Sequence, residues 1–293
     1  MAKSDRRLIR LFLLPPIIIL LAISLYPFLF GIYNSFHNWL LYKPQMGKPF
    51  VGFEQYIRIF SDPNFWMALR HTLTYVILSV TFSLLFGLIQ ALVLSRDEIK
   101  GKNIIRSLLI IPLVVAPVVI GFAFRFMYNS DLGVLPWLFQ QIGIRIPRIL
   151  GDPKIALFAV ILVDIWNQTP FAFLVLLAAV QSINPELYEV ASIDGASYWQ
   201  SLRHITVPLM RRAFLVVILI RTIDAFKAFD ILYVMTEGGP GRATEILSTL
   251  GYRFAFVGWR MGTASAFALI LFYTVVIIST LFIRLLRGDQ SYA

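Results

Sequence analysis

Three polar side chains lie close together within an apolar stretch of the sequence, residues 155–181. Asp164, Asn167 and Gln168 are spaced i, i+3 and i+4, so a helix would place them on one face. Trp166 lies beside them in the sequence. Carboxylate and amide groups hydrogen-bond to hydroxyls, and an indole ring can stack on a sugar ring. The set predicts either a path for a hydroxyl-rich solute or a polar contact between packed helices, and the sequence leaves both open.

A second charged set lies in another apolar stretch, residues 209–235. Arg221, Asp224, Lys227 and Asp230 follow one another at intervals of three, which lets neighbours pair along a helix. Ionisable groups in such stretches usually face a cavity, a partner or one another, because lipid cannot solvate them. The set therefore allows a self-neutralising ladder against a partner subunit, or a contribution of Asp224 and Lys227 to a solute path.

Residues for covalent chemistry are scarce. The sequence has three histidines (His37, His71 and His204), no cysteine, and neither a zinc-binding HExxH pair nor a phosphate-binding G-x-x-x-x-G-K-[ST] loop. We therefore expect a chain that is not an enzyme, carries no metal site and binds no cofactor of its own.

Composition indicates an all-α integral membrane protein. Of 293 residues, 58% are hydrophobic, and the mean hydropathy is +0.76. Because each crossing needs about 20 apolar residues, we predict one transmembrane domain, 1–293, with six spans. The predicted spans are about 8–34, 69–95, 104–127, 155–181, 209–235 and 261–286. The net charge of +10 does not indicate a nucleic-acid partner, since the basic residues flank these spans.

The N-terminal charges predict the orientation. Lys3, Arg6, Arg7 and Arg10 precede an apolar run that is longer than the core of a secretory signal. The positive-inside bias therefore places the N-terminus in the cytoplasm. Six crossings return the C-terminus to the same side and place residues 182–208 there as well.

The loop 182–208 has the features of a short, rigid helical hairpin. Asn184 can cap a helix that begins at Pro185, which has no N–H to lose. Glu186 and Glu189 would lie near the positive end of that helix. Gly195 would permit the chain reversal that ends it.

This loop resembles the cytoplasmic EAA loop of bacterial ABC-importer permeases, which reads Glu-Ala-Ala, a short gap, Asp-Gly-Ala and then Ile-x-Leu-Pro. The matching residues are Glu189, Ala191, Asp194, Gly195, Ala196, Ile205 and Pro208, whereas Val190 and Val207 depart from the pattern. The resemblance implies a coupling helix between spans 4 and 5 that docks on an ATPase. The residues expected to couple are Glu186, Glu189, Ala191, Asp194, Gly195, Ala196 and Pro208.

Two outer segments extend the resemblance to carbohydrate-uptake permeases of the maltose-type first subunit. Residues 50–73 are similar to the family pattern FVGxxNY…DPxFWxALxNTL, and residues 229–244 to FDxxYVxTxGGPGxxT. The glycines and Pro240 of the second segment force a turn. We expect Gly238, Gly239, Pro240 and Gly241 to dock a binding protein.

The resemblance implies the partners. They are a second homologous permease, two ATP-binding cassette subunits that hold ATP and Mg, an extracytoplasmic solute-binding protein, membrane lipid and a saccharide. The excess of basic residues in the outer segments allows an acidic saccharide such as a uronate oligomer. The expected location is the bacterial cytoplasmic (inner) membrane. An ion-coupled secondary transporter is the alternative, and it would leave the EAA pattern unexplained.

Overall fold

The fold is known from a computed structural model that describes residues 3–96, 98–143 and 148–288. Within these ranges the chain is helical and forms no strand, only two isolated bridges. The α-helices are α1 (Lys3–Ser35), α2 (Glu54–Ser61), α3 (Pro63–Leu94), α4 (Lys102–Val114), α5 (Pro117–Met127), α6 (Val134–Gln141), α7 (Ala156–Gln181), α8 (Glu186–Ile193), α9 (Tyr198–Ser201), α10 (Val207–Leu209), α11 (Arg211–Phe226), α12 (Asp230–Thr236), α13 (Leu247–Tyr252) and α14 (Met261–Gly288). A 3-10 turn covers Pro44–Met46, and π-helical turns cover Leu202–Thr206 and Arg253–Val257. The all-α membrane fold is as predicted.

The chain divides into two compact units. One comprises Met1–Trp66 with Leu250–Thr274, and the other comprises Met67–Thr249 with Val275–Ala293. The predicted cytoplasmic location of the chain ends also concerns residues 1–2 and 289–293, which lie outside the described residues.

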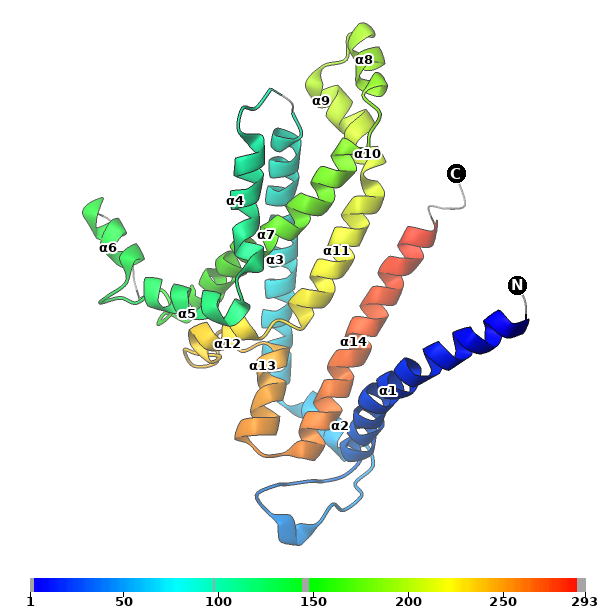
Figure 1. Cartoon of the computed structure of the whole chain (residues 1–293). Helices are drawn as coiled ribbons and strands as arrows, with labels where there is room; N and C mark the ends of the chain where they lie inside the picture. The colour runs from blue at the N-terminus through cyan, green and yellow to red at the C-terminus, as the bar shows by residue number, and fades with distance from the viewer. Residues whose placement is uncertain (1–2, 97, 144–147, 289–293) are drawn as a thin grey trace. The chain divides into compact units, whose positions relative to one another are not determined.

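Helix α7 is the centre of the larger unit. In Figure 1, α3, α4 and α11 run alongside it. Its most apolar window is 67% buried, although its mean hydropathy of 1.7 is the lowest among the four long apolar helices. Small residues permit close packing on α3, since a Cβ added to Gly87 would lie 2.7 Å from the Cβ of Ala172. Asp164, Asn167 and Thr169 of α7 are therefore enclosed by protein.

The predicted span 104–127 is broken rather than straight. It consists of α4 and α5, which meet at an angle of 94°. Val115 and Ala116 are extended, and Pro117 begins α5. Proline disfavours a helical conformation in the residue before it, and it cannot donate the hydrogen bond that would continue α4.

The predicted span 209–235 is also interrupted. Helix α11 ends at Phe226, and α12 begins only at Asp230. Phe229 leaves the helical region, with φ −143° and ψ −57°. Non-helical backbone at membrane depth is tolerated where it lines a cavity or is buried in protein, and this connection carries the charged Lys227 beside Asp230.

Four described helices are long and apolar enough to cross a membrane, or five if α4 and α5 together form one span. They include α1, α3, α7 and α14, which overlap the predicted spans 8–34, 69–95, 155–181 and 261–286. Helix α11 has 16 residues and is too short to be counted in this way. Six crossings and a single functional domain remain predictions.

The smaller unit joins the end of α1, helix α2 and the start of α14. Thr263 donates a hydrogen bond to Gln55 Oε1 (2.7 Å), and Tyr56 donates one to Ser35 Oγ (2.8 Å). A Cβ added to Gly262 would lie only 2.0 Å from the carbonyl oxygen of His37. Glycine at this position thus allows α14 to approach the backbone that follows α1.

Candidate functional site

The two helix breaks lie beside one polar cavity of about 310 Å³ in the larger unit. The cavity is bordered by α3, α5, α7, α11 and the start of α12. Its lining residues, called the polar cavity below, are Tyr75, Pro117, Asp164, Asn167, Gln168, Arg221, Asp224, Lys227, Ala228, Phe229, Asp230, Ile231 and Leu232. The predicted residues Asp164, Asn167, Gln168, Asp224 and Lys227 therefore converge on one site.

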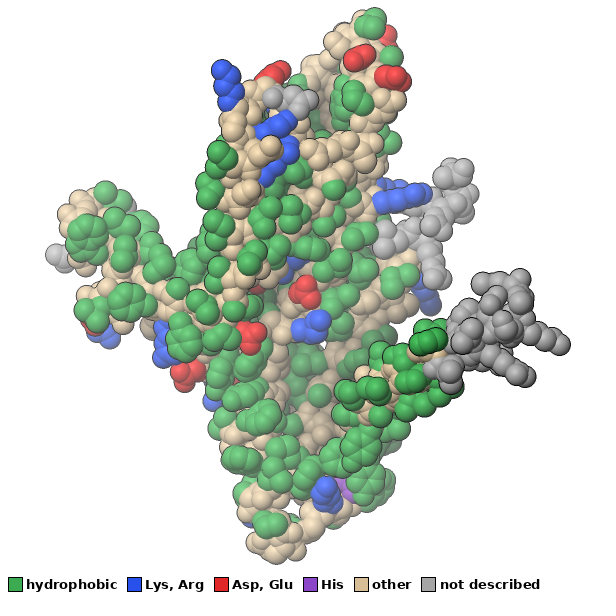
Figure 2. Space-filling view, viewed as in Figure 1, with side chains coloured by type: hydrophobic (Ala, Val, Ile, Leu, Met, Phe, Trp, Pro, Cys, Tyr) green, Lys and Arg blue, Asp and Glu red, His purple; other side chains and the backbone are tan. Residues whose placement is uncertain are grey.

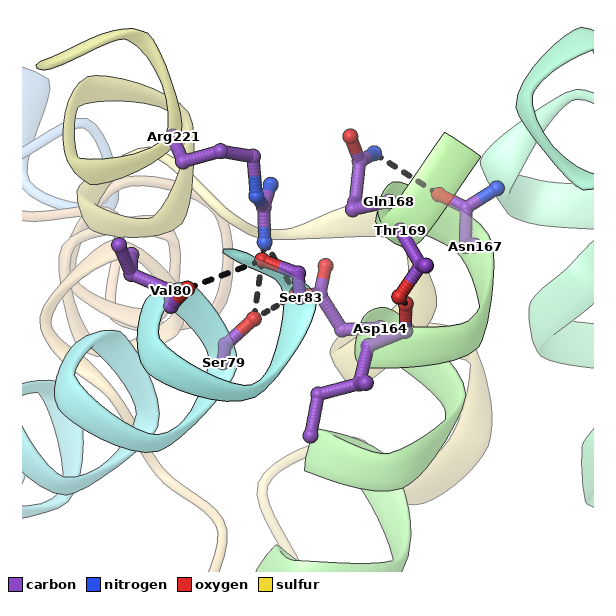
Figure 3. Close-up of polar contacts among 9 residues, drawn as sticks. Ser79, Val80, Ser83, Asp164, Asn167, Gln168, Thr169 and Arg221 are labelled. Carbon is purple, nitrogen blue, oxygen red and sulfur yellow. Dashed lines mark hydrogen bonds and ion pairs between the residues drawn. The ribbon is translucent and has the colours of Figure 1, made fainter. Parts of the chain in front are cut away.

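A buried ion pair joins α7 to α11 at this cavity. An Nη of Arg221 lies 2.7 Å from Asp164 Oδ2, and the two side chains are 1% and 8% exposed. Ser79 of α3 donates to the same carboxylate and accepts from Arg221 at 2.8 Å. Figure 3 shows these three side chains directed toward one another. A pair with such hydrogen bonds offsets much of the cost of burying two charges.

Arg221 does not belong to the expected ladder along one helix. It pairs across helices with Asp164, while Lys227 Nζ lies 3.7 Å from Asp224 Oδ1. Lys227 and Asp230 lie beyond the end of α11, so the spacing of three no longer corresponds to continuous helical turns. The expected pairing is therefore present only between Asp224 and Lys227, because Arg221 pairs with another helix and α11 does not continue to Asp230.

Asn167 and Gln168 have different surroundings. Asn167 is buried and donates from Nδ2 to the carbonyl oxygen of Pro112 at 2.7 Å. That carbonyl is in the last turn of α4, where the helix supplies no partner of its own. Gln168 is only half-buried and donates to Asn167 Oδ1 at 2.8 Å. Asn167 therefore stabilises the α4–α5 break, and Gln168 is the more accessible of the two.

Trp166 lies away from the polar cavity. It borders a second, mainly apolar cavity of about 460 Å³ beside α3 and α4, and its ring centroid lies 5.3 Å from that of Phe124. It is two residues from both Asp164 and Gln168, which places it on another side of α7. Placing Trp166 beside the polar face was a misprediction.

Helix α8 is built by local signals at both ends. Asn184 Oδ1 accepts from the backbone N–H of Glu186 at 3.1 Å, as expected for a cap. Glu186 and Glu189 lie in the first turn. At the other end Gly195 has φ +77°, and its N–H donates to Ser192 O. The N–H of Ala196 donates to Ala191 O, which completes the Schellman arrangement.

The apolar side chains of α8 are directed into open surroundings. Leu187, Val190 and Ile193 are 45%, 58% and 85% exposed, and Trp199 of α9 is 74% exposed. In Figure 2 apolar and acidic side chains lie together at the α8 end of the loop, whereas basic ones gather over the α3–α4 connection. Such a grouped apolar surface with acidic neighbours is typical of an interaction site.

One contact joins the two halves of the loop, and another joins the loop to Arg96, just beyond the end of α3. The hydroxyls of Tyr188 and Thr206 lie 2.9 Å apart, and Thr206 is buried just before Pro208. The Arg96 guanidinium lies over the Tyr198 ring, 4.9 Å from its centroid. Tyr188 of α8 is thus bonded to the segment that leads into α10.

The turn containing Gly238, Gly239, Pro240 and Gly241 is compact. Gly238 and Gly241 have φ +85° and +55°, values that side chains rarely adopt. Thr244 Oγ1 lies 2.7 Å from Thr236 Oγ1 and donates to Gly239 O at 2.8 Å, so the two ends of the turn are joined.

Several residues that hold the site were not predicted from sequence. Ser79 completes the buried ion pair, and Thr72 Oγ1 accepts from the backbone N–H of Leu247, 175 residues away. Arg125 of α5 donates to Val234 O and pairs with Glu237 at 3.2 Å. Each contact depends on helix packing, and no local pattern in the sequence marks these residues.

Comparison with known families gives a match over most of the chain. The model of the family described as "Binding-protein-dependent transport system inner membrane component" matches residues 83–287. This range includes α7, the loop 182–208 and the polar cavity apart from Tyr75.

Individual proteins are similar over nearly their whole length. The trehalose/maltose transport system permease protein MalF of Thermococcus litoralis is 36% identical over 91% of this chain and 90% of its own. The trehalose transport system permease protein SugA of Mycobacterium tuberculosis is 32% identical over 96% and 89%. A chain from the crystal structure of a bacterial ABC transporter that imports the acidic polysaccharide alginate is 25% identical, with a TM-score of 0.84 over 97% and 96%.

Proposed function

We propose that this chain, which belongs to the family of binding-protein-dependent transport system inner membrane components, forms a saccharide path together with a second, homologous permease. The observation that carries the proposal is the convergence of Asp164, Gln168, Asp224 and Lys227 on the polar cavity. Carboxylate, amide and ammonium groups can replace the hydrogen bonds that sugar hydroxyls lose when they leave water. The similarity to trehalose and maltose permeases supports a saccharide substrate.

Energy would come from two ATPase subunits that bind ATP and Mg and dock on α8. The exposed Leu187, Val190 and Ile193 provide an apolar contact surface. Glu186, Glu189, Ala191, Asp194, Gly195, Ala196 and Pro208 are the residues of this proposed coupling element. Closure of the ATPases would displace α8, and the Tyr188–Thr206 contact would carry the displacement toward α11. The mechanism is alternating access, and no covalent step takes place in this chain.

On the side of the membrane opposite α8, the Gly238–Gly241 turn would contact a solute-binding protein. Thr236 and Thr244 join the two ends of this turn through their hydroxyls. This contact supports the proposal because it fixes the shape of the surface that the binding protein would meet. A related alginate transporter, with 25% identity and a TM-score of 0.81, has been crystallised with a substrate-bound periplasmic protein. That structure supports an equivalent partner here.

The proposed location is the cytoplasmic membrane, with six crossings of one functional domain and both termini inside. The chain has no cysteine, so single cysteines report orientation without further substitutions. A cysteine at position 195 should react only with reagents that reach the cytoplasm, and one at 241 only from outside. Labelling at 195 from outside would contradict this orientation.

Uptake by reconstituted vesicles tests the function. The chain is reconstituted with its partner permease, the ATPases and the binding protein, and accumulation of labelled trehalose or maltose is measured. We expect uptake that requires ATP and survives dissipation of ion gradients by ionophores. Uptake driven by an ion gradient without ATP would instead establish the secondary-transporter alternative, and absence of saccharide uptake in an ATP-hydrolysing complex would refute the saccharide assignment.

A further inference from the structure

The negatively charged side chains that line the polar cavity outnumber the positively charged ones. Three carboxylates line it (Asp164, Asp224 and Asp230), against two cations (Arg221 and Lys227). The lining therefore contributes a net charge of −1. Arg221 and Asp164 are buried, whereas Asp224, Lys227 and Asp230 are exposed, so the excess charge lies on the solvent-accessible part of the lining.

Both cations already have carboxylate partners within this lining. Arg221 is 1% exposed and bonded to Asp164 at 2.7 Å. Lys227 Nζ lies 3.7 Å from Asp224 Oδ1. No ion pair between Asp230 and another described residue is seen within 4.0 Å, and Asp230 is exposed. A substrate carboxylate would have to share Lys227 with Asp224, and the nearby aspartates would repel it.

The same residues suit uncharged hydroxyls. Asp224 and Asp230 are acceptors for hydroxyl protons, and Gln168 offers both an acceptor and donors. Among the described residues, the buried Nε of Arg221 has no hydrogen-bond partner. This atom is enclosed by protein, so the side chains that can reach a saccharide hydroxyl are those of Gln168, Asp224 and Asp230.

We propose, building on the saccharide function above, that the polar cavity selects uncharged saccharides and disfavours uronates, with Asp224 and Asp230 as the residues that determine this preference. The preference would distinguish this chain from its structural relative that serves an acidic polysaccharide.

The test uses three probes that differ at one carbon. They are maltotriose, maltotriose with one C6 oxidised to a carboxylate, and the methyl ester of that acid. Binding to the purified complex of both permeases and the ATPases is measured by equilibrium dialysis without the binding protein, so that only the path contributes. We expect the acid to bind at least about tenfold more weakly than maltotriose, and the ester to recover most of this loss.

Variants assign the effect to the two aspartates. Asp224→Asn combined with Asp230→Asn should improve binding of the acid by about tenfold, because two nearby negative charges are removed. Asp131→Asn removes an exposed carboxylate that does not line the cavity, and it should leave the ratio of acid to maltotriose affinities unchanged.

The outcomes separate the two proposals. Equal binding of acid and maltotriose by the unmodified complex, or an unchanged ratio in the double variant, overturns the charge preference while saccharide binding stands. If no probe binds to a complex that still hydrolyses ATP, the saccharide path itself is refuted, and the preference with it.

Discussion

The loop 182–208 and the polar cavity are positioned by contacts of very different range. In the loop, the cap joins residues two apart, and the capping box of α9 joins Ser197 and Gln200, three apart. At the cavity, Arg221 bonds to residues 57 and 142 positions away. A local segment can therefore specify the shape of the loop, whereas the cavity exists only when α3, α5, α7, α11 and α12 have packed.

The two regions also differ in what surrounds their polar and apolar groups. The loop exposes Val190 and Ile193 and has acidic residues in its first turn. The cavity instead encloses a charged pair that is almost fully buried. Substitutions in the loop should thus alter coupling with little effect on folding, and substitutions at the ion pair should alter folding first.

The largest effect is expected from Arg221→Met. The change leaves Asp164 buried without its cation, which is expected to destabilise the protein by about 3–5 kcal/mol. Thermal unfolding of the detergent-purified complex and its monodisperse yield measure the loss. The double variant with Asp164→Leu should regain most of it, because no unpaired charge remains. A single variant as stable as the unmodified protein would show that Asp164 does not depend on Arg221 as its buried counter-charge.

The second largest effect is expected from Gly195→Pro, which should uncouple ATP hydrolysis from transport. Proline holds φ near −65°, whereas Gly195 has φ +77°. We expect normal membrane insertion but a loss of about tenfold or more in uptake and in substrate-stimulated ATP hydrolysis, for a distortion of about 1–3 kcal/mol. Gly195→Asn is the matched control, since asparagine tolerates the left-handed conformation. Equal loss in both variants would argue against the turn geometry as the cause.

A smaller effect on affinity should distinguish the two sides of α7. Gln168→Ala removes one hydrogen-bonding group from the cavity and should weaken substrate binding by about three- to tenfold. Trp166→Ala, on the other side, should leave affinity unchanged, although it removes packing against Phe124. Direct binding measurements on the purified complex provide the comparison, and the reverse ranking would place the substrate beside Trp166.

The smallest effect is expected at the contact between Tyr188 of α8 and Thr206. Tyr188→Phe keeps the ring and removes the hydroxyl that meets Thr206. Loss of this hydrogen bond removes about 0.5–1.5 kcal/mol of stabilisation. The ATP consumed per saccharide should therefore rise by about threefold, without an effect on basal hydrolysis. Tyr198→Phe retains the ring beneath Arg96 and should behave like the unmodified protein. If the ATP consumed per saccharide were unchanged in Tyr188→Phe, the Tyr188–Thr206 contact would have no part in coupling.

The sequence determined the features that depend on composition and on neighbours. Apolar length predicted the long helices α1, α3, α7 and α14, and Asn184 with Gly195 predicted the ends of α8 to within about two residues. The polar spacing of α7 correctly placed Asp164 and Gln168 on one face, because helix periodicity follows from the backbone alone. Family membership was likewise evident from residues close together in the chain.

Tertiary structure decided the rest. It interrupted the predicted span 209–235 and paired Arg221 with Asp164 rather than with its neighbours in sequence. The break in span 104–127 and the position of Trp166 were missed as well, although Pro117 and the helix spacing account for them locally. A charge in a low-dielectric interior takes the partner that packing brings nearest, whatever its distance along the chain. Spacing within one helix carries no information about that partner, and for this reason only the packed helices revealed the ion pair and the unbalanced charge of the cavity.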